Sequence, residues 1–577
     1  MDLSNNMLYG PIPATIGNLS SLTYLHVESN PLNGSLPMDL WQLSKLEILG
    51  IGYNSISGNL SEKSFTKLSN LKALTLDFSD FNFNFGTHWE PPFQLDVITI
   101  SNCKVGISSS GLSFNGEGKF WSFVMQIEFL YLSNNSISGD LSTTLITNRV
   151  IDLHSNKIGG LLPRLSPKVS LFNIANNSFS GPIYTLLCQN ITGTPELETL
   201  VMSYNLLFGE LPDCWMHWPS LRSVNLESNN LTGTIPESIG SLIFLHVLRL
   251  RKNILYGSIP SYLKSCENLR YLDLAYNEFT GNIPSWISHQ IQILILRSNK
   301  FNGSIPSQIC QFSNLQALDL ANNRLSGPLP NCLSNITSLV NEDTLDARST
   351  GEIYNYLPIR PSSLFHYEDL PLFVKGQDLD YLKTSNLVRV LDFSNNDFSG
   401  SIPTELFSLI ALHSLNLSHN HLTGKISGDI GRMRFLESLD LSSNLFSGEI
   451  PQNMSNLSFL GVLNLSYNNF SGRIPLGTQL QSFQASSYAG NLQLCGNPLP
   501  NHCTQEDKPN GSMEYKVDDD FKTSFQLGAG VGFASGFWGV CGTIFFIRKW
   551  RHAYFRTLEN FHVIILIKVN HLLYGQE

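Results

Sequence analysis

The side chains that could carry out acid–base or metal chemistry are spread along this 577-residue chain. His26, His154 and His419 stand far apart and share none of the short spacings that metal sites use. Five aspartates instead recur at one position of a repeating unit: Asp152, Asp273, Asp319, Asp392 and Asp440. A column of single carboxylates offers no paired acid and base. The sequence therefore predicts a protein that is not an enzyme and needs no cofactor, and we expect the aspartates to form a solvated face.

Binding is the chemistry that a second group of residues favours. Arginine and tyrosine supply many of the strongest contacts in protein interfaces. Both types fall on three adjacent repeats, at positions that the repeat does not need for packing. These positions hold Arg249, Arg251, Tyr271, Asp273, Tyr276 and Arg297. We expect them to form an exposed ligand-binding surface; ordinary surface variation is the alternative.

An internal repeat with the pattern L-x-x-N-x-L-x-G-x-I-P positions these residues. Most neighbouring repeats, such as those of Asn30 and Asn54, are 24 residues apart. Ser79 and Cys103 replace the asparagine in two units, and an insertion at about 107–125 lengthens another. The repeated asparagines are Asn6, Asn30, Asn54, Asn135, Asn156, Asn177, Asn205, Asn229, Asn253, Asn277, Asn299, Asn323, Asn396, Asn420, Asn444 and Asn468.

The pattern predicts a stack of short strands. In L-x-L the leucines point inward and their neighbours outward, and stacked copies bury a continuous core. The inward asparagine can satisfy backbone groups of the following turn. Glycine permits the bend, and Ile-Pro favours extended backbone. Segments such as ESIGSLIFLHVL are expected to return as short helices or 3₁₀ turns.

Two pairs of cysteines share one register in the repeat, with one thiol on each of two adjacent coils. The pairs are Cys188 with Cys214 and Cys310 with Cys332. We predict two disulfides between coils, which implies an oxidising compartment; four reduced thiols are the alternative. Cys103 is expected to be a buried thiol, and Cys266 has no evident partner.

The 24-residue unit with G-x-I-P resembles the plant extracellular leucine-rich repeat over about residues 1–503. The resemblance implies an α/β fold, a right-handed solenoid with a parallel sheet on its concave side. A terminal repeat must cover its open apolar end. Residues 476–503, which contain the sequence GTQLQSFQASSYAGNLQLCGNPLPNHC, resemble the C-terminal cap of the same family, in which Cys495 and Cys503 can close a small loop.

A long segment at 331–389 interrupts the repeats, which otherwise cover 1–330 and 390–475. It resembles the island region of plant receptor-like proteins, where a tyrosine and a Lys-Gly pair precede the last four repeats. Tyr367, Lys375 and Gly376 stand in comparable places. We expect Tyr367 and Lys375 to contact the ligand; a tolerated surface insertion is the alternative.

Residues 525–547 contain no charge and are long enough for one membrane-spanning helix. An acidic linker at 504–524 precedes them and basic residues follow, so we expect the tail at 548–577 to be cytoplasmic. This tail lacks kinase motifs. Glycines on one helix face predict pairing with another membrane helix: Gly528, Gly532, Gly536 and Gly539. The alternative to a membrane-spanning helix is a buried helix of a soluble protein. The alternative to helix pairing is the ordinary enrichment of glycine in membrane helices.

Glycosylation sequons recur along the chain, partly because the repeat itself creates them. Asn416 and Asn464 would fall on the concave strands, where a glycan would block binding. The sequons that we expect to carry glycans are Asn18, Asn134, Asn176, Asn230, Asn302, Asn335 and Asn453.

The resemblance implies a kinase-less cell-surface receptor of the plant receptor-like protein family. Such a protein sits in the plasma membrane with its N-terminal side outside, binds a peptide or protein ligand, and signals through adaptor and co-receptor kinases, in immunity rather than development. A net charge of −10 gives no basis for nucleic-acid binding. The alternatives are a cell-wall enzyme inhibitor or scaffold, a developmental receptor, a truncated receptor kinase and a non-functional fragment. Because MDLSNNMLYGPIP is already a finished repeat, we expect an N-terminal truncation.

Overall fold

The computed structural model describes residues 1–84, 89–103, 113–114, 123–341, 371–374, 377–380 and 388–503. Residues 1–503 form one compact unit. No helix within the described ranges is long and apolar enough to cross a membrane. Several predictions fall outside these ranges: the helix at 525–547 with Gly528, Gly532, Gly536 and Gly539, and the island residues Tyr367 and Lys375.

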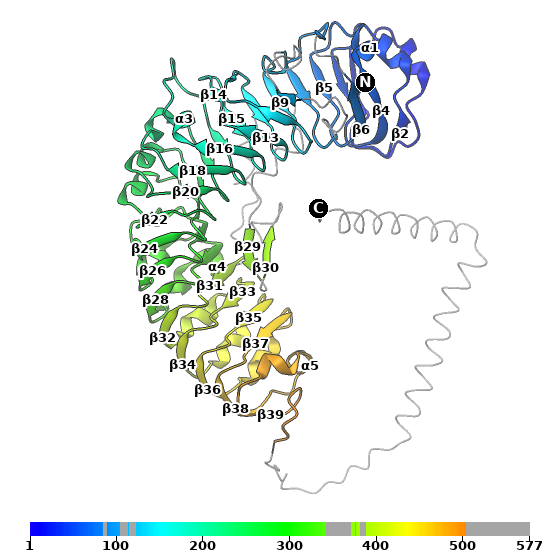
Figure 1. The fold of residues 1–577 in the computed structure, drawn as a ribbon. Helices are drawn as coiled ribbons and strands as arrows, with labels where there is room; N and C mark the ends of the chain where they lie inside the picture. Colours follow the sequence, from blue (N-terminus) through cyan, green and yellow to red (C-terminus); the bar gives the residue numbers. More distant parts are fainter. Residues whose placement is uncertain are drawn as a thin grey trace, which may run out of the picture. The chain divides into compact units, whose positions relative to one another are not determined.

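Short strands of three residues, one from each coil after the first, build a parallel sheet of seventeen strands among the described residues (Figure 1). The sheet confirms the predicted stack, and β27 pairs directly with β31, so the long segment between them leaves it continuous. Its strands are β1 (Tyr24–His26), β3 (Ile48–Gly50), β5 (Ala73–Thr75), β7 (Val97–Thr99), β9 (Phe129–Tyr131), β12 (Val150–Asp152), β15 (Leu171–Asn173), β17 (Thr199–Val201), β19 (Ser223–Asn225), β21 (Val247–Arg249), β23 (Tyr271–Asp273), β25 (Ile293–Ile295), β27 (Ala317–Asp319), β31 (Val390–Asp392), β33 (Ser414–Asn416), β35 (Ser438–Asp440) and β37 (Val462–Asn464).

A second series of short parallel strands follows the ladder positions and forms three smaller sheets. The first holds β2 (Asn33–Ser35), β4 (Ser55–Ser61) and β6 (Asp80–Asn84). The second holds β8 (Ser113–Phe114), β10 (Ser138–Asp140), β13 (Lys157–Gly160), β16 (Ser178–Pro182), β18 (Leu206–Glu210) and β20 (Asn230–Thr232). The third holds β22 (Tyr256–Gly257), β24 (Glu278–Asn282), β26 (Lys300–Gly303), β28 (Arg324–Gly327), β32 (Asp397–Ser401), β34 (His421–Gly424), β36 (Leu445–Glu449), β38 (Asn469–Arg473) and β39 (Gln493–Cys495). Two further pairs are β11 (Leu145–Ile146) with β14 (Arg164–Leu165), which are parallel, and β29 (Pro371–Val374) with β30 (Gln377–Asp380), which are antiparallel.

Most coils return through a short 3₁₀ helix, as predicted. In one coil Ile235 is buried, Pro236 is extended at φ −76° and ψ 160°, and η4 begins at the next residue. The 3₁₀ helices are η1 (Ala14–Asn18), η2 (Met38–Gln42), η3 (Trp215–His217), η4 (Glu237–Ser241), η5 (Ser261–Ser265), η6 (Ser307–Gln311), η7 (Asn331–Asn335), η12 (Thr404–Ser408), η13 (Gly428–Arg432), η14 (Gln452–Asn456) and η15 (Ala485–Tyr488). The described residues also form single-turn α-helices at α1 (Glu62–Phe65), α3 (Tyr184–Leu187), α4 (Thr337–Val340) and α5 (Thr478–Gln481).

The repeated asparagines form a ladder that links each coil to the one before it. The Asn277 amide donates to the carbonyls of Leu250, Leu274 and Ala275 at 2.9–3.1 Å, and its oxygen accepts from the Leu255 N–H at 3.0 Å. The preceding residue, Tyr276, has a left-handed φ of 53°. A left-handed residue recurs before each ladder position, which the sequence pattern did not indicate, because non-glycine residues adopt this conformation infrequently.

Cys103 shows how a substitute fits into the ladder. Its buried thiol donates to the Leu76 carbonyl at 3.0 Å and to the Ser101 carbonyl at 3.3 Å. Burial raises the pKa of this thiol to about 12, which keeps it in the donating form. Cys103 is therefore the buried thiol that the repeat predicted, and Cys266 is also free and buried.

The boundary predicted for the long interruption is wrong at its start. Residues 331–341 continue the repeat through η7 and α4, and Leu333, Ile336 and Leu339 are fully buried in the core. The Leu339 carbonyl also accepts from the Ala411 N–H at 3.0 Å, which ties this turn to the coil after the interruption. The sequence predicts the wrong start because this segment lacks the next ladder asparagine. Its apolar residues nevertheless keep the spacing of the outer turn.

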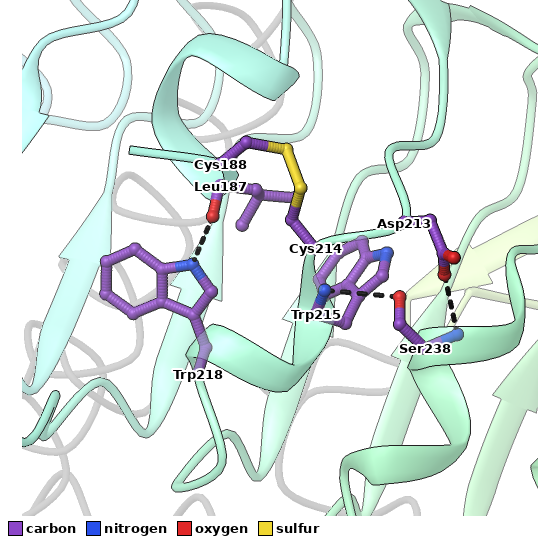
Figure 2. The surroundings of a disulfide bond; sticks show 7 residues. All are labelled: Leu187, Cys188, Asp213, Cys214, Trp215, Trp218 and Ser238. Carbon is purple, nitrogen blue, oxygen red and sulfur yellow. Dashed lines mark hydrogen bonds between the residues drawn. A yellow bond between two sulfur atoms is a disulfide. The ribbon is translucent and has the colours of Figure 1, made fainter. Parts of the chain in front are cut away.

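The predicted cysteine pairs are the disulfides of the structure, Cys188–Cys214, Cys310–Cys332 and Cys495–Cys503. Figure 2 shows the first of them beside two buried tryptophans. The Trp218 indole N–H donates to the Leu187 carbonyl at 3.0 Å. The Trp215 indole N–H has no acceptor among the residues that the structure describes, while its backbone N–H donates to the Ser238 hydroxyl at 3.2 Å.

These two tryptophans provide a matched test of what the indole hydrogen bond contributes. Both side chains are fully buried. We expect Trp218→Phe to destabilise these coils by about 1–2 kcal/mol more than Trp215→Phe, because only the former leaves a buried carbonyl without its donor. Hydrogen exchange of the amides in α3 and β19 measures the difference. Equal losses of protection in the two variants would contradict this account.

The C-terminal cap covers the last coil, as expected. Asn491 adds one more ladder position, which the sequence analysis did not include: its amide donates to the Leu465 carbonyl at 3.0 Å. Tyr488 is fully buried, and its hydroxyl donates to the Leu480 carbonyl at 2.6 Å. The cap therefore repeats the hydrogen bonding of a coil while ending the apolar stack.

Candidate ligand-binding face

The large parallel sheet presents three side chains of each coil on the side opposite the core. In the coil of β23 these are Tyr271, Asp273 and Ala275, whereas Leu272 and Leu274 belong to the core. The strands pair in register, so the equivalent residues of neighbouring coils lie side by side. We call the surface that these positions form the sheet face.

The residues predicted to bind ligand gather on the middle of the sheet face, but they are packed against one another. The Arg249 guanidinium lies 4.5 Å from the centre of the Tyr271 ring, and that of Arg251 lies 4.8 Å from the Tyr276 ring. Arg251 also lies 3.7 Å from the Glu227 carboxylate. We call the following group the central cluster: Glu227, Arg249, Arg251, Tyr271, Asp273, Tyr276, Arg297, Asp319 and Asp392.

Arg297 joins two aspartates of the central cluster that are far apart in the sequence. Its Nε donates to Asp319 at 2.7 Å, and its Nη2 donates to Asp392 at 2.5 Å. All three side chains are at most 8% exposed. One guanidinium therefore compensates two buried carboxylates on either side of the long interruption.

The prediction that these residues form an exposed surface is therefore wrong. Arg249, Arg251, Tyr271, Asp273 and Arg297 are all less than 9% exposed; Tyr276 is half-buried. The aspartate column is not solvated either, since Asp152, Asp273, Asp319 and Asp392 are buried and only Asp440 is half-buried. The physical reason is that the arginines meet aromatic rings or carboxylates of neighbouring coils, and such pairs are invisible within a single repeat. Asp152 instead pairs with His154 of its own coil.

The three histidines lie in separate surroundings. His26 contacts Glu28 at 2.7 Å, His154 contacts Asp152 at 2.7 Å, and His419 is exposed at a left-handed turn. Hydrogen bonding to Glu28 raises the pKa of His26 above its ordinary value.

Burial sets the charge state of the aspartates on the sheet face. Loss of hydration raises the pKa of Asp273 to about 6, although Arg251 opposes the shift. Loss of hydration also raises the pKa of Asp77 to about 7, against a hydrogen bond from the Ser101 N–H at 2.7 Å. The pKa of Asp319 is raised by burial and by the charge of Asp392.

We expect the protein to be more stable in mild acid than at neutral pH. A carboxyl whose pKa is raised on folding binds more protons in the native state than in the unfolded state, so its contribution falls as pH rises from about 4 to about 7. Asp273→Asn should flatten this dependence by about 1–2 kcal/mol between pH 5 and pH 7.5. The check is the thermal midpoint at pH 5 and 7.5, with Asp440→Asn, at the same repeat position but half-buried, as the control.

A groove of about 580 Å³ crosses the sheet face over the first five strands, from β1 to β9. The repeat pattern did not predict this groove. The available signal was a run of acidic residues immediately before these strands, at Glu47, Asp96 and Glu128. Further along the sheet the same position holds mostly arginine, glutamine or histidine.

The seven asparagines expected to carry glycans are all exposed, which leaves them accessible to modification. Asn416 and Asn464 are half-buried on the sheet face and donate to Asp392 and Asp440 at 3.3 Å. Glycosylation itself stays a prediction.

The leucine-rich repeat family model matches residues 220–242, 268–289, 314–336, 387–409, 411–433 and 435–457. With the stacked coils and the asparagine ladder, these matches define a leucine-rich-repeat protein. The chain is similar to two proteins of Solanum lycopersicum, receptor-like protein EIX2 (44% identical over 531 residues) and receptor-like protein EIX1 (42% over 534 residues). Over most of its length the chain is therefore similar to plant leucine-rich-repeat receptor-like proteins. Each match covers 87% of this chain and 51% of the relative, so the chain spans about half the length of these relatives.

Two solved structures with a similar fold are ectodomains of Arabidopsis receptor kinases. HAESA, in complex with the peptide hormone IDA and the co-receptor SERK1, is 27% identical with a TM-score of 0.57, over 86% of this chain and 82% of that one. GASSHO1/SCHENGEN3 of Arabidopsis thaliana, in complex with CASPARIAN STRIP INTEGRITY FACTOR 2, is 25% identical with a TM-score of 0.58, over 87% and 59%.

Proposed function

We propose that the chain is the ligand-recognising part of a non-catalytic cell-surface receptor in plant immunity. The segment at 525–547 would anchor it in the plasma membrane, with residues 1–503 outside. It would signal through partner receptor kinases, whose membrane helices would pack against the glycine face of that segment. The single observation that carries the proposal is the similarity to EIX2 over 87% of the chain.

The structure supports recognition as the mechanism. The described strands build one continuous parallel sheet whose face varies in charge from coil to coil, while the asparagine ladder and core stay constant. Proteins of this fold have been solved with peptide ligands and a co-receptor. Three disulfides among the described residues are consistent with an oxidising, extracellular setting.

A cell-wall inhibitor or scaffold is the second candidate, because the repeats alone would suffice for it. The uncharged run at 525–547, followed by basic residues, favours the receptor. A developmental receptor differs only in the source of the ligand.

The proposal is tested by expressing the tagged full chain in leaf cells and recovering it with detergent. We expect receptor kinases to co-purify with it, and their phosphorylation to rise after addition of microbial culture filtrate but not of plant peptide extract. A triple variant, Gly528→Leu with Gly532→Leu and Gly536→Leu, should lower kinase recovery about tenfold by blocking close helix approach. A chain that salt alone washes from the wall, with no kinase bound, would favour the inhibitor.

A further inference from the structure

We propose that the groove over β1–β9 binds an extended peptide segment whose lysine or arginine side chains alternate with apolar ones. The groove is separate from the central cluster, which lies over β21–β31. The inference rests on the proposed function only in treating the sheet face as the surface that meets the ligand.

The floor of the groove is apolar and has the length of a short peptide. It consists of the first residue of each strand: Tyr24, Ile48, Ala73, Val97 and Phe129. Aromatic rings stand at both ends, and small aliphatic side chains lie between them. Neighbouring strands are about 4.8 Å apart, so five strands span about 19 Å, which is the length of about six extended residues. The volume of about 580 Å³ is also in the range of ligand sites.

The walls of the groove are acidic. Glu28, Glu47, Asp96 and Glu128 contribute four carboxylates, against one ammonium group from Lys72 and the imidazole of His26. With His26 neutral, four negative charges and one positive charge leave a net charge of −3. An apolar floor between acidic walls matches a cationic, partly apolar peptide and repels an acidic one.

The carboxylates differ in how far neighbours already compensate them. Glu47 is paired with Lys72 at 2.7 Å, and Glu28 contacts His26 at 2.7 Å. Glu128 lies 3.6 Å from Arg149 and is 49% exposed. Asp96 is exposed and makes no ion pair with any residue that the structure describes. Asp96 and Glu128 are therefore the side chains best placed to receive cations of a ligand.

A peptide cation fits these walls better than a metal ion. Within the described ranges no three acidic, histidine or cysteine side chains come close enough together to hold one. The carboxylates instead stand singly on the coils of β1, β3, β7 and β9, spread along the groove, where separate side chains of an extended peptide can reach them.

The test measures binding of a fluorescein-labelled peptide, acetyl-LKFKLK-amide, to the purified full chain by fluorescence anisotropy. The matched probe is acetyl-LEFELE-amide. We expect only the lysine peptide to bind, and Asp96→Lys and Glu128→Lys each to raise its Kd by about tenfold. Raising the salt from 50 to 300 mM should also weaken binding, because the rim charges are exposed.

Glu198→Lys is the matched control. Glu198 occupies the position of Glu128 in a coil outside the groove, pairs with the next arginine, Arg222, at 3.4 Å, and is 51% exposed. It should leave the Kd unchanged. The proposal that the groove binds a cationic peptide would be overturned by any of three results: equal binding of both peptides, an effect of Glu198→Lys equal to that of Glu128→Lys, or no binding of the lysine peptide. Kinase recovery in leaf cells would still test the receptor proposal separately.

Discussion

Replacing Arg297 by leucine is expected to weaken the coils of β25–β31 by about 3–5 kcal/mol at neutral pH, because it leaves two buried carboxylates uncompensated. Asp319 and Asp392 both depend on this one guanidinium, at 2.7 and 2.5 Å. The loss should shrink at pH 5, because burial and the neighbouring charge already raise the pKa of Asp319. Hydrogen exchange of the amides of β25, β27 and β31 reads out this local stability.

Two controls separate the buried charge from the loss of a long side chain. Arg222→Leu removes an arginine whose pair with Glu198 is exposed, and should cost less than about 1 kcal/mol. Adding Asp319→Asn and Asp392→Asn to Arg297→Leu should restore much of the stability at neutral pH. A single variant that unfolds equally at both pH values, with no rescue by the asparagines, would show that packing rather than charge accounts for the effect.

Replacing Asn277 by alanine is expected to cost about 3–5 kcal/mol, since it removes four buried hydrogen bonds at once and leaves backbone groups unpaired. The side chain joins its own turn to the preceding coil, and it is 7% exposed. Loss of amide protection in β21, β22 and β23 measures the effect.

The chain offers graded comparisons for this ladder position. Asn277→Cys should be milder than alanine, because Cys103 already fills a ladder position by donating to two carbonyls. Asn6→Ala should cost less than about 1 kcal/mol, since Asn6 is exposed and donates only to the nearby carbonyls of Leu3 and Ser4. Equal losses at positions 6 and 277 would contradict the ladder as a major source of stability.

Much of the fold followed from sequence because each element depends on its own coil. The L-x-L strands, the inward asparagines, the Ile-Pro turns and the register of Cys188 with Cys214 are all local patterns that repeat. The left-handed residue before each ladder position was not predicted, since many residue types occupy it: serine, tyrosine, asparagine, histidine, lysine and phenylalanine.

The candidate ligand-binding face could be predicted from the sequence only in part. Sequence identified which residues of the central coils differ from the generic repeat, and the structure does bring Arg249 against Tyr271 and Arg251 against Tyr276. Their exposure was predicted wrongly, because it depends on rings and carboxylates contributed by other coils. The groove over β1–β9 was not predicted at all, since its floor and walls come from five coils whose side chains look ordinary one at a time.

The sequence by itself determined the repeat, the direction of each side chain and the positions of the disulfides. These properties are set within one coil or between two adjacent coils, and period and spacing are enough to reveal them. Only the tertiary structure decided which charges are buried, which carboxylates share Arg297, and where the sheet face opens into a groove. Those outcomes depend on the side chains that several coils bring next to a residue, and the sequence of one repeat does not show which side chains its neighbouring coils contribute.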